Sequence, residues 1–333
     1  MGKRLNLILS LIVGLGIFGY FLYYVGVDSI IQIFSNINLL YLSLFFVVTT
    51  LAFFPTAWRW QIILKAHNKK ISFWHILKYT ISGYAVSYIT PMVNAGGEPI
   101  RAYMLKKEHK VDLKTGSSSI IIDKFVELFG TVIFGVTGLF LFLFLPQISL
   151  WLKILLGGAI LLGFFVMLIL YYRTIKGKGS FSSLFVFLRL HKIARWKSFV
   201  LVLKDVEEKM QKFFNKSKKA FILSFVAYLF YGILAIFEFK FLLLSFGFDA
   251  SITIVILSIT LFGFANFFPV PAALGFLEAG QTSLFTALRG EGSIGFALSL
   301  MVRIRALIFV AIGFAFITYF GGNQMNRTYK KNT

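Results

Sequence analysis

The chain has 333 residues, of which 58% are apolar and 18% aromatic, and its mean hydropathy is +0.82. Soluble globular chains are only about 45–50% apolar, so these values exclude an ordinary water-soluble enzyme. The net charge is +21, but charged residues make up only 14% of the chain, too few for a surface that follows nucleic acid phosphates. The absence of cysteine excludes disulfides, thiolate catalysis and cysteine-bound metals. The composition therefore predicts an all-α integral membrane protein.

Six apolar runs are long enough to cross a bilayer, for which a helix needs about 20 residues. The first follows Lys3 and Arg4 and lacks the short apolar region and small-residue cleavage site of a secretory signal, so we expect it to be retained. The predicted full spans are 5–24, 40–64, 117–145, 154–172, 220–246 and 293–320.

Two further apolar segments, 73–90 and 252–268, are shorter and end at prolines. If 73–90 crossed fully, the basic cluster around Lys107 would face outside, against the preference of Lys and Arg for cytoplasmic loops. We therefore predict that both segments enter the membrane and return as re-entrant helical hairpins. The prediction is six full transmembrane helices plus two re-entrant hairpins, with both termini cytoplasmic. Eight full spans are the alternative, because 252–286 can also be read as two crossings.

The segment 173–219 between the fourth and fifth spans is strongly basic. Its apolar residues recur every three or four positions, which predicts an amphipathic helix with a stripe formed by Phe199, Leu203, Val206, Met210 and Phe213. We expect this helix to lie in the membrane interface, with its bases near anionic inner-leaflet lipids. Packing of the helix on the bundle is the alternative. No other segment divides the chain, so residues 1–333 are predicted to form one membrane domain.

The two proline-terminated segments are similar to each other. At one constant offset the matched pairs are Thr80 and Thr260, Gly83 and Gly263, Ala85 and Ala265, Pro91 and Pro271, and Glu98 and Glu278. Each half, about 1–146 and 147–322, then holds three crossings and one hairpin. An odd number of crossings places the halves in opposite orientation. This is an inverted repeat, the plan of transporters whose broken segments form the substrate site near the midplane.

Both hairpins contain residues that break helices and free backbone polar groups. Such groups are tolerated at membrane depth only when they are buried in protein or line a wet cavity. We therefore predict that the backbone at these positions contributes to the site: Pro91, Asn94, Gly96, Gly97, Pro269, Pro271 and Gly275.

Charged residues inside the predicted spans also need a role, because one ionised side chain near the bilayer centre costs about 2.5–3.5 kcal/mol. Asp123 and Glu127 share a helix face, and the repeat places Arg303 opposite Asp123. We predict that the two halves supply opposite charges to one substrate cavity. Its residues are Arg59, Glu98, Arg101, Asp123, Glu127, Glu278 and Arg303. Alternatively, Arg59 only anchors its span at the interface, and Asp123 with Lys124 forms a structural pair.

The chain resembles the lysylphosphatidylglycerol synthase transmembrane (flippase-like) family over residues 5–320. The resemblance rests on motifs in a given order: Arg59-Trp60, Gly96-Gly97-Glu98-x-x-Arg101, Asp123-Lys124, Pro269-x-Pro271-x-x-Leu274-Gly275-x-x-Glu278 and Arg303. Family members typically show Pro-Gly-Gly-Leu-Gly in the fourth motif, where this chain has Ala272 and Ala273 at the two central positions. The resemblance implies the membrane domain only, without the C-terminal aminoacyl-transfer domain of the bifunctional relatives.

What the resemblance implies for function is a flippase that moves an anionic or aminoacylated phospholipid between leaflets, in the plasma membrane of a prokaryote. Arg303, Arg59 and Arg101 would suit phosphate through paired hydrogen bonds. The acidic residues would carry protons or accept a cationic headgroup. We expect a membrane lipid as substrate, a separate lipid-synthesising enzyme as partner, and no nucleic acid.

Two other function classes remain open. One is a membrane component of lipid modification, named phosphatidylglycerol lysyltransferase after the family, and the other is a non-transporting membrane regulator. Against an enzyme, the sequence contains neither Gly-x-Ser-x-Gly nor His-Glu-x-x-His. Its four histidines lack metal-ligand spacing. We therefore predict no catalytic residue, no metal and no cofactor.

Overall fold

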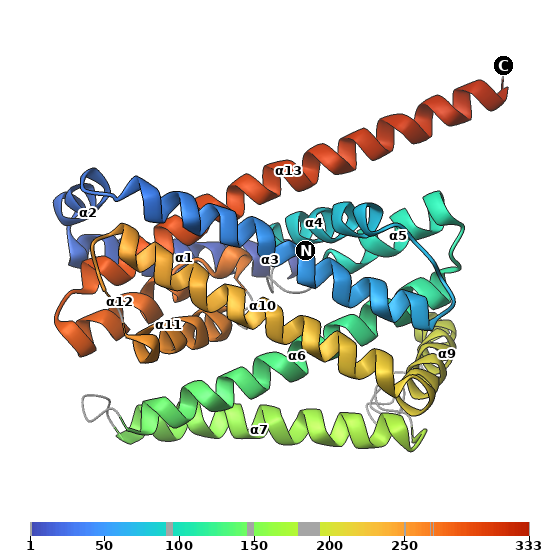
Figure 1. Ribbon diagram of the computed structural model, residues 1–333, viewed down its shortest axis with the longest axis horizontal. Helices are drawn as coiled ribbons and strands as arrows, with labels where there is room; N and C mark the ends of the chain where they lie inside the picture. The colour runs from blue at the N-terminus through green and yellow to red at the C-terminus, as the bar shows by residue number, and fades with distance from the viewer. Residues whose placement is uncertain are drawn as a thin grey trace.

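The computed structural model describes residues 2–90, 96–144, 150–178, 194–249, 251–266, 268 and 270–332. The regular elements within these ranges are all helical, which confirms the predicted all-α fold class (Figure 1). They are α1 (Gly2–Val25), α2 (Val27–Ser35), α3 (Leu39–Ala66), α4 (Phe73–Ile89), α5 (Glu98–His109), α6 (Leu113–Leu143), α7 (Leu150–Ile175), α9 (Ala194–Lys216), α10 (Lys218–Ser245), α11 (Ile252–Ala265), η2 (Pro271–Ala273), α12 (Phe276–Arg289) and α13 (Gly292–Asn332).

Among the described residues, four helices are each long and apolar enough to cross a membrane, namely α3, α6, α10 and the part of α13 that ends at Gly321. They match four of the six predicted spans. The first predicted span is α1, which continues after a 75° bend as the short helix α2. The bend falls at Gly26, whose φ of 82° is readily adopted by glycine. The remaining predicted span lies in α7, which is 26 residues long.

The two proline-terminated segments are arms of helical hairpins. Helices α4 and α5 pack against each other, and so do α11 and α12. The second pair has 14 residues in each arm, or about 21 Å at 1.5 Å per residue, which is shorter than the hydrocarbon core of about 30 Å. The two hairpins lie toward opposite ends of the molecule (Figure 1). These lengths fit the predicted six spans with two hairpins and do not fit eight full spans.

Helices α4 and α5 approach each other through glycines. A Cβ atom added to Gly97 would lie 1.9 Å from the backbone oxygen of Gly83, so no larger residue fits at this crossing. The N–H of Gly97 also donates to the Oγ of Ser87 at 2.9 Å. The backbone of Gly97 is therefore used to close the first hairpin.

The same order of elements occurs twice in the chain. A long helix, the two arms of a hairpin and a second long helix follow one another as α3 to α6 and again as α10 to α13. Helices α3 and α10 make the most extensive helix–helix contact in the molecule. The corresponding long helices of the two sets therefore form its centre, and the exact limits of the half-repeats stay a prediction.

The predicted amphipathic helix in 173–219 is confirmed as α9. Its residues Val206, Met210 and Phe213 are buried and pack in one cluster with Ile63 of α3 and Phe125 of α6. This part of the apolar stripe therefore faces protein, as in the alternative interpretation, and not the lipid interface. The side chains of the other two stripe residues, Phe199 and Leu203, lie outside the described residues. Contact of the α9 bases with anionic lipids stays a prediction.

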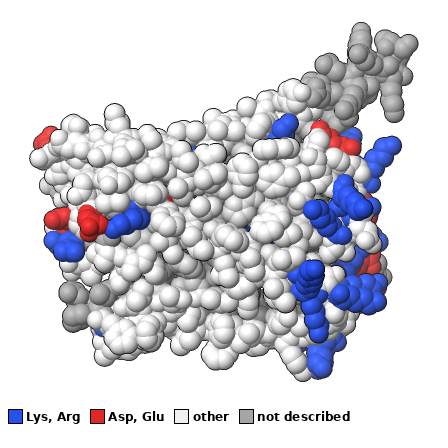
Figure 2. Space-filling model, in the orientation of Figure 1, with Lys and Arg blue, Asp and Glu red and all other residues white. Residues whose placement is uncertain are grey.

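Charge is distributed unevenly along the bundle. Figure 2 shows lysines and arginines gathered at one end of the molecule, the end at which α5 and α9 lie in Figure 1. The wide surface between the two ends is almost free of charge in this view. An apolar belt with one basic end is the pattern of a multi-pass membrane protein that obeys the positive-inside rule.

Candidate functional site

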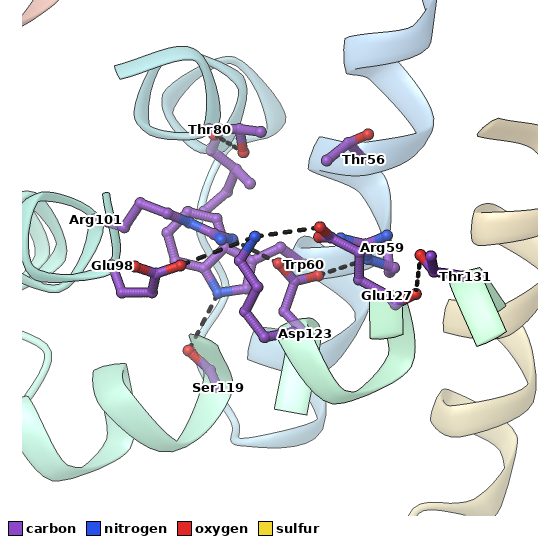
Figure 3. Close-up of polar contacts among 12 residues, drawn as sticks. Thr56, Arg59, Trp60, Thr80, Glu98, Arg101, Ser119, Asp123, Glu127 and Thr131 are labelled. Atoms are coloured by element: carbon purple, nitrogen blue, oxygen red, sulfur yellow. Dashed lines mark hydrogen bonds and ion pairs between the residues drawn. The ribbon is translucent and has the colours of Figure 1, made fainter. Parts of the chain in front are cut away.

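An ionic cluster joins α3, α5 and α6 in the interior of the bundle (Figure 3). The Nε of Arg59 donates to Oδ1 of Asp123 at 2.7 Å, and its Nη2 donates to Oε2 of Glu127 at 2.8 Å. The other carboxylate oxygen of Asp123 accepts a hydrogen bond of 2.8 Å from Nη2 of Arg101. The side chains of Arg59 and Asp123 are only 2% and 0% exposed. The alternative in which Arg59 merely anchors a span at the interface is therefore wrong.

Trp60 supports this cluster from the side. The guanidinium carbon of Arg101 lies 3.9 Å from the centre of the Trp60 ring, within the range of a cation–π contact. The indole Nε1 donates to the Oγ of Ser119 at 3.2 Å, which fixes the ring between α3 and α6. Arg101 is thus held both by the ring and by the carboxylate of Asp123.

One edge of the cluster keeps accessible surface. Lys124 lies 3.2 Å from Oε1 of Glu127 and 3.8 Å from Oε1 of Glu98. The side chains of Glu98, Lys124 and Glu127 are 28%, 24% and 25% exposed. Glu127 lies about 21 Å along α6 from its first residue, at 1.5 Å per residue, so this accessible surface is deep in the fold. We refer to these three residues as the open edge of the first cluster.

The first cluster borders α10. On the same face of α6, one turn beyond Glu127, the hydroxyl of Thr131 lies 3.2 Å from the hydroxyl of Tyr228 in α10. The ring of Tyr228 is in turn 6.0 Å from the guanidinium carbon of Arg59. The accessible charges therefore border α3 and α10, the two central helices.

A second ionic cluster lies at the other hairpin. Arg303 of α13 pairs with Glu278 of α12 through two contacts, Nε to Oε1 at 2.5 Å and Nη2 to Oε2 at 2.9 Å. Glu278 Oε2 also accepts the backbone N–H of Gly275 at 2.8 Å. Because the side chain of Glu278 is 0% exposed and that of Arg303 12% exposed, this cluster is closed.

The break in the second hairpin is shaped by left-handed backbone. Ala272 and Ala273 have φ angles of 56° and 51°, and Gly275 has a φ angle of 82°. The left-handed conformation costs about 1–2 kcal/mol for a residue with a Cβ atom. The carbonyl oxygens of the two alanines accept hydrogen bonds of 2.9 and 3.3 Å from Arg303. The strained turn therefore directs two more acceptors at this arginine.

The two clusters follow one plan. In the first hairpin Glu98 accepts the N–H of Gly96 at 2.6 Å and lies beside Lys124, just as Glu278 accepts the N–H of Gly275 and pairs with Arg303. Each hairpin glutamate thus binds the backbone of its own break and meets a base on the next long helix.

A second pair of contacts corresponds between the two halves, but the acid and the base are exchanged between the helices. Arg59 of α3 pairs with Glu127 of α6, whereas Glu238 of α10 pairs with Arg305 of α13. Corresponding pairs of long helices are therefore joined by ion pairs of opposite polarity. The sequence analysis did not include Glu238, Arg305 or Lys124 among the cavity residues. The signal that could have found them is that each is a charged residue inside a predicted span.

The predicted single cavity stays a prediction, and the structure shows where its charged residues lie. The structure brings together Arg59, Glu98, Arg101, Asp123 and Glu127, as predicted, but it places Glu278 and Arg303 in the second cluster. Arg303 does not pair with Asp123 across the repeat, because each is bound within its own half. Of the predicted helix-breaking residues, Pro91, Asn94 and Pro269 lie outside the described residues. Pro271 begins η2, and Gly275 precedes α12 as its N-cap.

Four tyrosines lie between the clusters. Tyr228 and Tyr231 of α10 have ring centres 6.0 Å apart, and so do Tyr84 and Tyr88 of α4. Tyr231 lies near Glu127 of the first cluster and near Arg305, Tyr84 lies near Arg305, and Tyr88 lies near Arg303. A phenol both donates and accepts hydrogen bonds without carrying a charge. The sequence analysis missed these residues, since no spacing distinguishes them from other aromatic residues.

The fold and the two clusters define a multi-pass membrane protein whose buried charges are gathered at paired helical hairpins. The chain belongs to the family described as the lysylphosphatidylglycerol synthase TM region, whose family model matches residues 7–313. This confirms the family expected from the sequence motifs.

Curated relatives carry only a general name. A UPF0104 membrane protein of Pyrococcus horikoshii is 21% identical over 314 residues, which are 89% of this chain and 91% of the relative. One from Methanothermobacter thermautotrophicus is 21% identical over 82% of this chain and 83% of its own length. One from Methanocaldococcus jannaschii is 29% identical over 31% of each chain. No solved structure gives a significant match.

Proposed function

We propose that this protein moves a phospholipid with an anionic or aminoacylated headgroup between the leaflets of the membrane. The observation that carries the proposal is the open edge of the first cluster. Glu98, Lys124 and Glu127 keep about a quarter of their surface accessible deep in an apolar bundle. Charges at such depth are costly and typically belong to a substrate pathway. The printed name of the family, which refers to a lysylphosphatidylglycerol synthase, supports a lipid as the substrate class.

The open edge suits a headgroup that carries both signs of charge. The ammonium group of Lys124 binds phosphate as a point charge, while Glu98 and Glu127 accept the amino group of an aminoacylated lipid. This differs from our first expectation, in which Arg303, Arg59 and Arg101 bind the phosphate. All three arginines are bound to carboxylates in this conformation. Arg59 and Arg101 join α3 and α5 to α6, and Arg303 holds the break of the second hairpin.

The route that we propose runs along the tyrosines. Hydroxyl groups of Tyr228, Tyr231, Tyr84 and Tyr88 would replace the hydration of a headgroup between the open edge and the second cluster. The acyl chains would stay in the lipid outside the bundle. They would contact exposed apolar residues such as Leu229, Phe230 and Ile233 of α10.

Reconstitution tests this function. Purified protein in liposomes that contain fluorescent phosphatidylglycerol or its lysyl derivative is expected to speed the exchange of label between leaflets. Lys124→Gln is expected to abolish the exchange, whereas Lys114→Gln is expected to preserve it, because Lys114 forms an exposed pair with Asp205. Exchange at the rate of protein-free liposomes, for both lipids and with a proton gradient imposed, would overturn the proposal.

We also propose that the protein lies in the plasma membrane with both termini cytoplasmic. The basic end of the molecule supports this orientation (Figure 2). Because the chain contains no cysteine, a single introduced cysteine reports one position. Lys107→Cys, at the end of α5, is expected to react with a membrane-impermeant maleimide only after the cells are opened. Reaction in intact cells would place the basic end outside and contradict this orientation.

A further inference from the structure

The first hairpin carries a second group of polar side chains, far along both arms from its break. His75 lies in the first turn of α4, and Glu108 and His109 are the last two residues of α5. These positions are distant in the sequence, so no ligand spacing indicates them. The hairpin brings them together because its two outer ends lie side by side.

The geometry of this group is that of a ligand set. One ligand atom from each of His75, Glu108 and His109 lies within 4.8 Å of the others. The two imidazole rings lie in direct contact, with centres 5.0 Å apart and an interplanar angle of 82°, an edge-to-face arrangement. All three residues are partly accessible, which leaves a path for a ligand from solvent.

Two nitrogens in this group have no hydrogen-bond partner among the described residues. They are Nδ1 of His75 and Nε2 of His109, and both atoms are buried. A buried polar atom without a partner costs about 1–3 kcal/mol. Binding of a ligand between the rings would remove this penalty at both nitrogens together.

The carboxylate is already oriented. The hydroxyl of Tyr79, one turn beyond His75 on α4, donates a hydrogen bond to Oε2 of Glu108. Metal-binding carboxylates and histidines are commonly held by such outer hydrogen bonds, which fix the direction of the ligand. Tyr79 is largely buried, at 2% exposure, so its position is defined by packing.

We propose that His75, Glu108 and His109 bind a divalent transition-metal ion, with Zn²⁺ as the best fit, and that water completes the coordination. Two imidazoles and one carboxylate are a common zinc donor set, and three protein ligands leave one position open. In a tetrahedral site with bonds of about 2.0–2.1 Å the ligand atoms lie about 3.3 Å apart, so small side-chain rotations close the site.

The bound ion would act as a clamp on the hairpin. It would tie the start of α4 to the end of α5, and these helices position Glu98 and Arg101 at their other ends. This site is separate from the ionic clusters, and the proposal does not depend on lipid transport.

A binding experiment on the untagged, metal-free protein in detergent tests the proposal. Zn²⁺ titrated in a calorimeter is expected to bind with one equivalent per chain. His75→Ala and His109→Ala are each expected to weaken binding at least tenfold. His67→Ala is the matched control, because this histidine lies at the same end of the bundle but its Nδ1 contacts the carbonyl oxygen of Ile63 at 2.9 Å.

Two further measurements separate a metal site from a loss of folding. Co²⁺ in place of Zn²⁺ is expected to give the intense visible absorption of a tetrahedral complex in the wild type and only the weak absorption of the hydrated ion in His75→Ala. Glu108→Gln is expected to weaken Zn²⁺ binding while the melting temperature in chelator stays unchanged. Equal Zn²⁺ affinity of the wild type and a His75→Ala, His109→Ala double variant would overturn the proposal, as would the absence of binding to the wild type.

Discussion

The two hairpins share one plan but differ in how completely their charges are enclosed. Glu98 of the first hairpin is 28% exposed and lies 3.8 Å from its base, whereas Glu278 of the second is 0% exposed and forms a two-point pair with Arg303. The first hairpin is therefore suited to exchange a partner, and the second is suited to hold its break in place. Under the proposed function, equivalent positions of the repeat divide binding and structural roles between them.

The largest loss of stability is expected when the buried ion pairs of the first cluster are broken. Asp123→Asn leaves Arg101 buried beside an uncharged side chain and Arg59 with Glu127 as its remaining carboxylate. Removal of one member of a buried ionic group costs about 3–5 kcal/mol. We expect a large fall in the free energy of unfolding, measured by denaturation with SDS in mixed micelles.

The matched control for this variant is Glu208→Gln. It removes an exposed pair with Lys212 on α9 and is expected to change stability by less than about 1 kcal/mol. Equal stability of the Asp123→Asn variant and the control would show that the first cluster is not held by its charges.

The next prediction concerns stability, which is expected to differ between variants of the two hairpins. Glu278→Gln is expected to lower stability by about 1.5–3 kcal/mol, the range for a hydrogen bond to a charged group. Glu98→Gln is expected to leave the melting temperature close to that of the wild type but to reduce lipid exchange. Melting curves and liposome assays on the same preparations measure both. A stability loss in Glu98→Gln as large as that in Glu278→Gln would remove the distinction between an open and a closed hairpin.

A smaller effect tests the exchanged polarity of the long-helix pairs. Glu238→Arg and Arg305→Glu are each expected to destabilise the protein, because each places like charges in contact. The double variant is expected to recover part of the loss, with a coupling energy of about 0.5–3 kcal/mol. A double-mutant cycle of melting measurements gives this value. Strictly additive losses would mean that the ion pair between α10 and α13 does not contribute to stability.

The sequence predicts the long helices well and the short ones less well. The apolar runs in α3, α6, α10 and α13 are long enough to need a membrane, and length alone identifies them. Helix α2 has nine residues, and it follows a bend that only the left-handed φ of Gly26 permits, so no long run predicts it. The apolar stripe of α9 predicted a helix, but it did not show what the helix packs against, because an apolar face can be buried in protein or in lipid.

The charged site could be predicted only within one half. Helical spacing correctly grouped Asp123 with Glu127 and Glu98 with Arg101. The repeat offset relates Arg303 to Asp123 but does not predict their partners, because equal positions in two inverted halves are related by symmetry and need not be in contact. The packing of helices decides which charges are in contact, as for Arg59 and Asp123. This packing cannot be predicted from a sequence offset.

The smallest effect concerns the strained turn of the second hairpin. Ala272 and Ala273 adopt left-handed φ angles, which glycine adopts more readily than alanine. Replacement of both by glycine removes the steric penalty of the Cβ atoms, about 1–2 kcal/mol per residue. Glycine also gains entropy in the unfolded chain, which offsets about 0.4–1 kcal/mol of this at each position.

We expect the Ala272→Gly, Ala273→Gly variant to melt slightly higher than the wild type. Since Arg303 binds the carbonyl oxygens of these residues and not their side chains, both hydrogen bonds should survive. A lower melting temperature would instead show that the methyl groups pack usefully, and that the second hairpin is held closed by contacts other than its ion pair.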